Sequence, residues 1–163
     1  MSDPTVLFRP AVPADLHAIC VLGQDVNALH HVAAPRFFSA PSAPERDADY
    51  WGASLEGAGN AAFVAERNGR VVGFITARMA DNQGTLVPPM RYASIGSVCV
   101  AASERGRGIG RRLLTLVEEW AVAEGAEDVR LMVWRFNDGA KRLYEELGYE
   151  VRSMAMGKVL RDA

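Results

Sequence analysis

The stretch Ser103–Gly110 has the composition of a phosphate-binding turn. Glycine and arginine alternate in it, and it follows an apolar run and precedes a helical pattern. Glycines let backbone N–H groups approach an anion closely, and the beginning of a helix carries positive partial charge. Four arginines surround the glycines and only Glu104 opposes them, a local charge of +3: Arg105, Arg107, Arg111 and Arg112. The sequence therefore predicts a site for a diphosphate group. The simpler alternative is a solvated basic helix start that needs a tight turn.

Two familiar nucleotide-binding motifs do not fit this stretch. A Walker A loop needs Gly-Lys-Ser/Thr, and no lysine follows Gly110. A dinucleotide fingerprint, G-x-G-x-x-G, needs its third glycine where Arg111 or Leu113 stands. Nucleic-acid binding is also disfavoured, because the net charge of the chain is −2 and no aromatic residues interleave with the arginines. A nucleotide-dependent dehydrogenase or kinase is therefore disfavoured as well.

Two motifs together identify a family. Arg105-Gly106-Arg107-Gly108-Ile109-Gly110 fits the pattern [Q/R]-x-x-G-x-[G/A], and the stretch Asn137–Tyr149 fits N-x-x-A-x-x-x-Y-x-x-x-G-[FY]. With these residues the chain resembles the GNAT superfamily of acyl-coenzyme-A-dependent N-acyltransferases. The resemblance covers nearly the whole chain, from Phe8-Arg9-Pro10-Ala11 onward. It implies a mixed α/β fold: a largely antiparallel central sheet whose middle strands splay apart, flanked by helices.

The resemblance also implies where coenzyme A binds. Its diphosphate would rest on the backbone amides of the turn, contributed by Arg105, Gly106, Arg107, Gly108, Ile109, Gly110 and Arg111. Its pantetheine arm would lie beside the strand Ser97–Val100 like an additional strand, paired with Val98 and Val100. Asn137 stands where family members place an amide that bonds the cofactor. It could equally cap the helix from Asp138, and both roles are compatible.

The resemblance implies which side chain protonates the leaving group, but it does not identify the general base. Attack of an amine on a thioester needs an N–H donor for the carbonyl oxygen, here the backbone of Val98 or Cys99. It also needs a proton for the departing thiolate, which Tyr144 would supply as a protonated phenol. Many relatives carry a base, a glutamate, in the strand Ser94–Val100, and this chain does not. Candidates for the base are Ser97, a water chain, Glu66 and His31.

Length and composition indicate the kind of protein that carries this chemistry. The chain has 163 residues, 49% hydrophobic and 23% charged, which predicts one globular domain over 1–163. Cys20 and Cys99 are far apart among apolar neighbours, so we expect two reduced core residues. The histidines His17, His30 and His31 lack metal-ligand spacing, so no metal is predicted. No apolar stretch could span a membrane, and the N-terminus does not look like a leader. A cytoplasmic protein is expected.

The elements that must position these residues follow from periodicity and turn signals. A hairpin is predicted around Asn68-Gly69, and Gly96 suits a bulge in the strand after it. The expected strands are Thr5–Arg9, Ala61–Ala65, Val71–Ile75, Ser94–Val100, Val129–Trp134 and Glu150–Val159. Four helices are expected. The first begins near Pro13 and ends near Leu29, and the second covers Glu45–Leu55. The third runs from the glycine-rich turn to Gly125, and the fourth covers Asp138–Leu147.

The sequence thus predicts an acetyl-coenzyme-A-dependent N-acetyltransferase. The acceptor would be a primary amine of a small molecule or peptide, attacked directly in a ternary complex. The alternative is a non-catalytic acyl-coenzyme-A-binding sensor or subunit. The missing strand carboxylate favours this alternative slightly, whereas the presence of both Asn137 and Tyr144 favours catalysis. A homodimer could form through Met154, Met156 and Val159.

Overall fold

The computed structural model describes residues 5–161. Five strands occur in these residues: β1 (Leu7–Pro10), β2 (Asn60–Arg67), β3 (Arg70–Asp81), β4 (Arg91–Val100) and β5 (Asp128–Arg130). The α-helices are α1 (Leu16–Ala33), α2 (Ala48–Gly52), α3 (Ile109–Ala123) and α4 (Asp138–Glu146). Short 3-10 turns precede three of them: η1 (Pro13–Asp15), η2 (Pro44–Asp47) and η3 (Ala102–Glu104). The chain forms two compact units, with the boundary between Met132 and Val133.

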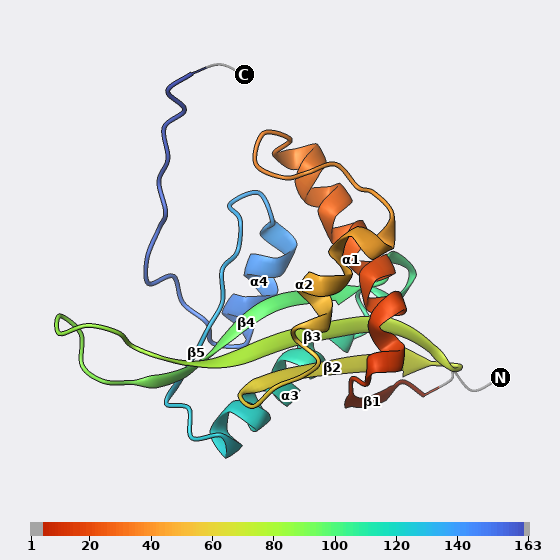
Figure 1. Cartoon of the computed structure of the whole chain (residues 1–163), viewed down its shortest axis with the longest axis horizontal. Coiled ribbons are helices and arrows are strands. Elements are labelled where there is room, and N and C mark those ends of the chain that lie inside the picture. Colours follow the sequence, from red (N-terminus) through yellow and green to blue (C-terminus); the bar gives the residue numbers. More distant parts are fainter. Residues whose placement is uncertain (1–4, 162–163) are drawn as a thin grey trace. The chain divides into compact units, whose positions relative to one another are not determined.

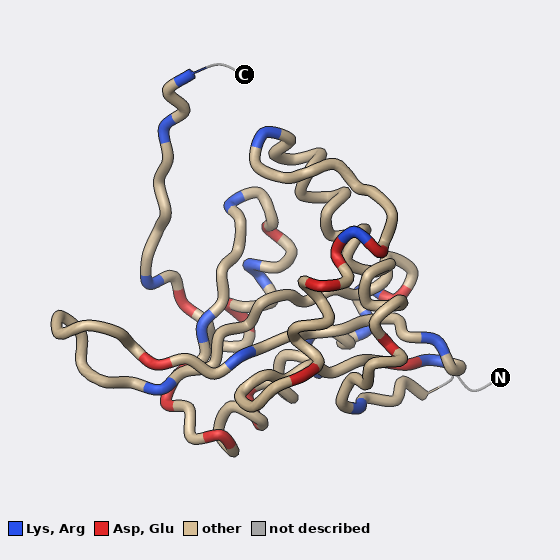
Figure 2. Tube along the Cα trace, viewed as in Figure 1, with Lys and Arg blue, Asp and Glu red and all other residues tan. Residues whose placement is uncertain are grey.

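The first unit is a sheet covered by helices on both faces. The strand order is β1-β2-β3-β4-β5, antiparallel except for the parallel pair of β4 and β5. Helices α1 and α2 lie on one face and α3 lies on the other (Figure 1). This arrangement confirms the predicted mixed α/β class. Basic and acidic residues are interspersed along the trace (Figure 2).

Apolar side chains of the helices pack on both faces of the sheet, at the helical spacing seen in the sequence. On the α1 face, Ile19, Cys20 and Leu22 pack with Trp51, Val64, Phe74 and Cys99. In α3 the apolar stripe is fully buried at Leu113, Leu114, Val117 and Ala121. The helix ends at Ala123, and Gly125, the predicted stop signal, follows the C-cap Glu124 with a φ of 81°.

The hairpin between β2 and β3 turns where it was predicted. Asn68 has a φ of 52° and Gly69 a φ of 74°. Positive φ at both central residues is the requirement of the tight primed turn that matches strand twist. The Asn-Gly pair therefore fixes the register that carries β3 into the middle of the sheet.

The predicted bulge at Gly96 is present and shapes β4. Ser97 pairs with Thr76 of β3, but Ala77 pairs with Ile95, so Gly96 is the extra residue. On the other edge, the ladder between β4 and β5 runs only from Tyr92 to Ser94. Beyond Ser94, no strand of residues 5–161 pairs with that edge of β4.

Two predicted strands are corrected. The strand expected over Val129–Trp134 is shorter, because β5 ends at Arg130, opposite Ser94 of β4. The strand expected over Glu150–Val159 does not form; these residues have no regular secondary structure. Alternation and β-branched residues give a segment strand propensity, but a strand also needs a ladder partner for its backbone groups. No helix among residues 5–161 is long and apolar enough to cross a membrane.

Candidate functional site

The outer edge of β4 presents the backbone groups that the site needs. The Ala101 N–H donates to Val72 O of β3 at 2.8 Å. Successive residues of a strand direct their N–H and C=O groups to opposite edges, so Cys99 also faces β3. The backbone N–H groups of Val98 and Val100 therefore point to the other edge, where the ladder with β5 has ended. An extended ligand could pair with them there.

Cys99 contributes packing and not chemistry to this edge. Its side chain is 3% exposed, and its thiol donates to Leu22 O of α1 at 3.2 Å. Burial raises the pKa of the Cys99 thiol to about 12, although Arg105 opposes the shift. The thiol is neutral at physiological pH, and a neutral thiol is a poor nucleophile. Cys20 is likewise buried, and both cysteines are free thiols.

The glycine-rich turn leads from β4 into α3 through two left-handed residues. Gly106 has a φ of 73° and Gly108 a φ of 80°, and Gly108 is the N-cap of α3. The first intrahelical bond of α3 runs from Arg112 N–H to Gly108 O. The N–H groups of residues 109, 110 and 111 therefore project from the helix start, at its positive end. This geometry suits a diphosphate.

The arginines of the turn are less free than the sequence suggests. Glu104 lies 3.3 Å from Arg67 Nε and 3.8 Å from Arg107 Nε, and Arg112 pairs with Glu119 at 2.8 Å. Arg105 donates from Nε to Val100 O at 3.0 Å, so its guanidinium lies against the outer edge of β4. The ion pairs of Glu104 thus connect the turn to β2 and to Arg107 within the turn.

A hollow adjoins the turn on the α1 side. It has a volume of about 240 Å³ and is lined by Asp25, Ala28, Leu29, Ala102 and Arg105. The three α1 residues were not predicted as part of the site. Their i, i+3, i+4 spacing marks one face of a helix, but the sequence does not say what that face meets. The hollow offers apolar wall next to the turn and one charge of each sign.

Asn137 and Tyr144 belong to the second unit and are described within it. Asn137 is the N-cap of α4, and its Oδ1 accepts the Ala140 N–H at 3.2 Å, so the capping role is confirmed. The Tyr144 ring lies 5.9 Å from the Tyr149 ring. Burial raises the pKa of the Tyr144 phenol above its usual value of 10.0. The phenol is therefore protonated at neutral pH, as a proton donor must be.

The structure narrows the candidates for the base. Glu66 on β2 is 2.7 Å from Arg9, which also binds Asp15 at 2.8 Å, so Glu66 is part of an ion-pair network at the β1–β2 edge. His31 Nδ1 lies 2.8 Å from Phe38 O and must donate to it, which leaves Nε2 as the acceptor of the neutral ring. Ser97 lies on β4 after the bulge.

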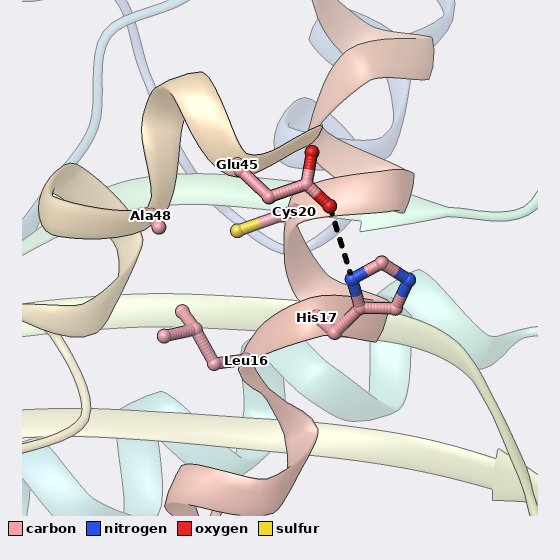
Figure 3. A pocket seen from close by; sticks show the side chains of 5 residues that line it. All are labelled: Leu16, His17, Cys20, Glu45 and Ala48. Atoms are coloured by element: carbon pink, nitrogen blue, oxygen red, sulfur yellow. Dashed lines mark ion pairs between the residues drawn. The ribbon is translucent and has the colours of Figure 1, made fainter. Parts of the chain in front are cut away.

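A second hollow, of about 190 Å³, lies between α1 and η2 (Figure 3). Its rim carries His17 and Glu45, 3.7 Å apart, and the Cys20 sulfur faces inward between Leu16 and Ala48 (Figure 3). These groups do not form a metal site. Among residues 5–161 no cluster of three potential ligands is placed to hold a metal ion.

The sequence of the chain is similar to those of known acetyltransferases. The model of the acetyltransferase (GNAT) family matches residues 26–149. The uncharacterized N-acetyltransferase MJ1207 of Methanocaldococcus jannaschii is 35% identical over 95 residues, 58% of this chain and 41% of that protein. Acetyltransferase ECA0875 of Pectobacterium atrosepticum is 34% identical over 99 residues, 60% of this chain and 64% of that protein. The match thus spans less than two thirds of either relative.

Solved structures share the fold. A mutant BH1408 protein from Bacillus halodurans superimposes with a TM-score of 0.88 at 21% identity, over 95% of this chain and 99% of the other. Aminoglycoside N-acetyltransferase AAC(6′)-Iy in complex with CoA gives 0.72 at 16% identity, over 96% and 100%. The same enzyme with the bisubstrate analog CoA-S-monomethyl-acetylneamine gives 0.72 at 18%, over 97% and 99%.

Proposed function

The chain belongs to the acetyltransferase (GNAT) family, and from that premise we propose that it transfers an acetyl group from acetyl-coenzyme A to a primary amine. The amine attacks directly, in a ternary complex. The family match runs across the boundary between the two units, which supports a single catalytic domain that includes both. The free cysteines suit a reducing compartment, and we propose the cytoplasm.

One observation carries the proposal: the unpaired edge of β4 runs directly into the glycine-rich turn. Val98 and Val100 supply edge N–H groups, and five residues after Val100 the chain enters the turn that exposes the first amides of α3. An extended arm and a diphosphate, joined to each other, would meet these two features in order. Coenzyme A has that construction. The residues present therefore fit the cosubstrate.

We propose that the backbone N–H of Val98 stabilises the negative charge that develops on the thioester oxygen. Acetyl-coenzyme A supplies an acyl carbon that is activated by its sulfur leaving group. Because the Val98 N–H points to the open edge and the Cys99 N–H points to β3, we assign the oxyanion donor to Val98. A fixed backbone donor needs no reorganisation as charge develops, and loss of one such donor costs about 10²–10³ in rate.

Tyr144 would protonate the departing thiolate. Its phenol carries a proton at neutral pH, and burial, which raises its pKa, preserves that proton at alkaline pH. A side chain that donates a proton in the transition state contributes about 10²–10⁴ in rate. Asn137, seven residues earlier at the start of α4, would bond the cosubstrate through its amide while it caps the helix.

The acceptor amine must lose a proton before it attacks. An alkylammonium with a pKa near 10.4 is only about one part in a thousand free amine at pH 7. No carboxylate occurs in β4, and Glu66 is held by Arg9. Ser97, a water chain and His31 are the remaining groups for this step. An acceptor of lower pKa would reduce the need for any of them.

The acceptor we propose is a primary amine on a small molecule or a peptide. A neighbour in fold, AAC(6′)-Iy, is known with a bisubstrate analog that joins CoA to an acetylated neamine. A second candidate function is an acyl-coenzyme-A-binding sensor or subunit without turnover. The absence of a carboxylate from β4 favours it. Both functions require the same cosubstrate site, and turnover separates them.

The experiment is a transfer assay. The purified protein is incubated with acetyl-coenzyme A and a panel of primary amines (aminoglycosides, polyamines, amino acids and lysine peptides), and released thiol and acetylated amine are measured together. We expect equal amounts of both with at least one amine. Binding of acetyl-coenzyme A without release from any amine would support the sensor, and no binding would contradict both functions.

A further inference from the structure

Glu104, the one acidic residue of the stretch Ser103–Gly110, lies between two arginines. Its Oε2 is 3.3 Å from Arg67 Nε and 3.8 Å from Arg107 Nε. Arg107 belongs to the glycine-rich turn, whereas Arg67 is the last residue of β2. Since β3 lies between β2 and β4 in the sheet, the ion pair of Arg67 and Glu104 spans β3. A distant part of the chain thus supplies a counter-ion to the turn.

The two ion pairs of Glu104 differ in burial. The side chains of Arg67 and Glu104 are 11% and 15% exposed, whereas the side chain of Arg107 is 48% exposed. Arg67 Nε and Glu104 Oε2 are both shielded from solvent. Opposite charges attract each other more strongly where water does not screen them. Arg67 is therefore the main counter-ion of Glu104, and the longer, more exposed pair with Arg107 is the weaker one.

A carboxylate beside a diphosphate site opposes binding unless a cation compensates its charge. Glu104 directly precedes Arg105 in the chain, and α3 begins five residues after it, at Ile109. Removal of one partner of a buried ion pair leaves the other charge uncompensated. Without Arg67, the carboxylate of Glu104 would repel an anion at the turn and hold Arg107 more strongly.

We propose that Arg67 is a positioning residue of the coenzyme A site, which neutralises Glu104 so that this carboxylate neither repels the diphosphate nor competes with it for Arg107. The inference rests on the proposed function. Arg67 acts through Glu104 and does not touch the ligand. Loss of Arg67 should therefore weaken binding of the diphosphate, and removal of the Glu104 charge as well should restore it.

The test is a double-mutant cycle on the full chain, with the Kd of coenzyme A measured by titration calorimetry. In Arg67→Met, which keeps an unbranched side chain without the charge, we expect the Kd to rise about tenfold, about 1.4 kcal/mol. Glu104→Gln should not raise the Kd. In the double variant Arg67→Met/Glu104→Gln no carboxylate opposes the anion, so the Kd should return to within about twofold of the wild-type value.

A purely structural role of the ion pair predicts a different pattern. If the pair only holds the turn in place, Glu104→Gln and the double variant also lack it, and both should bind coenzyme A weakly. That result would overturn the inference, and so would an unchanged Kd in Arg67→Met. Arg107→Met keeps the test decisive even if Arg67→Met does not fold. It should raise the Kd about tenfold, and an unchanged Kd would overturn the inference.

A second ligand assigns the effect to the diphosphate. Dephospho-coenzyme A keeps the diphosphate and lacks the 3′-phosphate, so Arg67→Met should weaken it by the same factor as coenzyme A. A loss confined to coenzyme A would assign the effect to the 3′-phosphate and overturn the inference.

Arg70→Met is the matched control. Arg70 is exposed and pairs in register with Arg67 across the hairpin, so its loss removes a positive charge nearby. Both Kd values should change less than about twofold, and a rise as large as in Arg67→Met would overturn the inference. Failure of the wild type to bind coenzyme A would overturn the proposed function and the inference with it.

Discussion

Gly96 and Thr76 meet across the bulge of β4 with no space for a side chain between them. A Cβ on residue 96 would lie 2.9 Å from Thr76 Oγ1, and Thr76 is 4% exposed. The bulge separates the part of β4 that pairs with β5 from the part whose outer edge is open. The absence of a side chain at residue 96 thus allows the bulge to form between these two parts of β4 while both stay paired with β3.

Gly96→Ala should therefore destabilise the protein by about 1–3 kcal/mol through overpacking. The measurement is urea unfolding. Thr76→Ala removes the opposing hydroxyl, so the double variant should recover part of the loss, beyond what the two single changes would add up to. Gly139→Ala is the matched control, since a Cβ there would meet nothing within 4 Å. Equal stability of Gly96→Ala and Gly139→Ala would show that the bulge tolerates a side chain.

A second glycine serves the packing of α1. A Cβ on Gly23 would lie 2.8 Å from Trp51 Nε1, and the Trp51 ring packs against Phe74 at 5.2 Å. Gly23→Ala should lower the free energy of unfolding by about 1–3 kcal/mol, because the indole must move out of its site. Gly52→Ala, where the nearest side-chain atom is 3.7 Å away, should cost much less. Thermal melts of the two variants test this prediction, and equal melting temperatures would contradict it.

The sequence predicted the features that depend on local chemistry. Asn68-Gly69 demands a primed turn by itself, and Gly106, Gly108 and Gly125 mark left-handed positions where the next element begins or the last one ends. Such left-handed positions need no information about distant residues. The bulge at Gly96 was predicted from a glycine inside an apolar run, but the contact with Thr76 that leaves no space for a side chain depends on a distant residue.

Features that depend on distant partners were not predictable. Nothing near Gly23 in the chain indicates that Trp51 will lie on it, and the guanidinium of Arg130 contacts Asn82 and Tyr92, which lie in two other segments. In the segment Glu150–Val159 the sequence predicted a strand that the structure lacks, because strand-like residues form no strand without a ladder partner. Tyr144 and Asn137 came from family resemblance, and their roles at the site stay predictions.

Cys99 should be inert and its protonation should affect stability only at high pH. The pKa of its thiol is raised by burial to about 12, so the folded state favours the neutral form. The stability from the buried thiol is full below the unfolded value of about 8.5 and is lost as pH rises toward 12. Iodoacetamide at pH 8 should label Cys99 only after unfolding, as mass spectrometry can show. Labelling of the folded protein, or loss of acetyl transfer in Cys99→Ala, would contradict this prediction and indicate that the Cys99 thiol acts as a nucleophile.

Tyr144→Phe should lower kcat at least about tenfold, because the thiolate would leave without its proton donor. The Kd of coenzyme A should change little, since the ring is retained. Tyr149→Phe, whose ring lies 5.9 Å from that of Tyr144, is the matched control and should keep its rate. Because burial raises the pKa of Tyr144, a decline of wild-type activity through loss of this proton should begin at a higher pH than it would for an exposed tyrosine. An unchanged kcat in Tyr144→Phe would remove Tyr144 from the mechanism.

The central claim, that the open edge of β4 and the glycine-rich turn hold acetyl-coenzyme A, is tested most directly by a thermal melt. A ligand at about a hundred times its Kd adds about 2.7 kcal/mol to stability, a shift of several degrees. We expect this shift with acetyl-coenzyme A and none with ATP or NAD. Val98→Pro should greatly reduce it, since the outward N–H is lost while the β3 ladder is kept. No shift for the wild type at millimolar acetyl-coenzyme A, or an equal shift for Val98→Pro, would contradict the account.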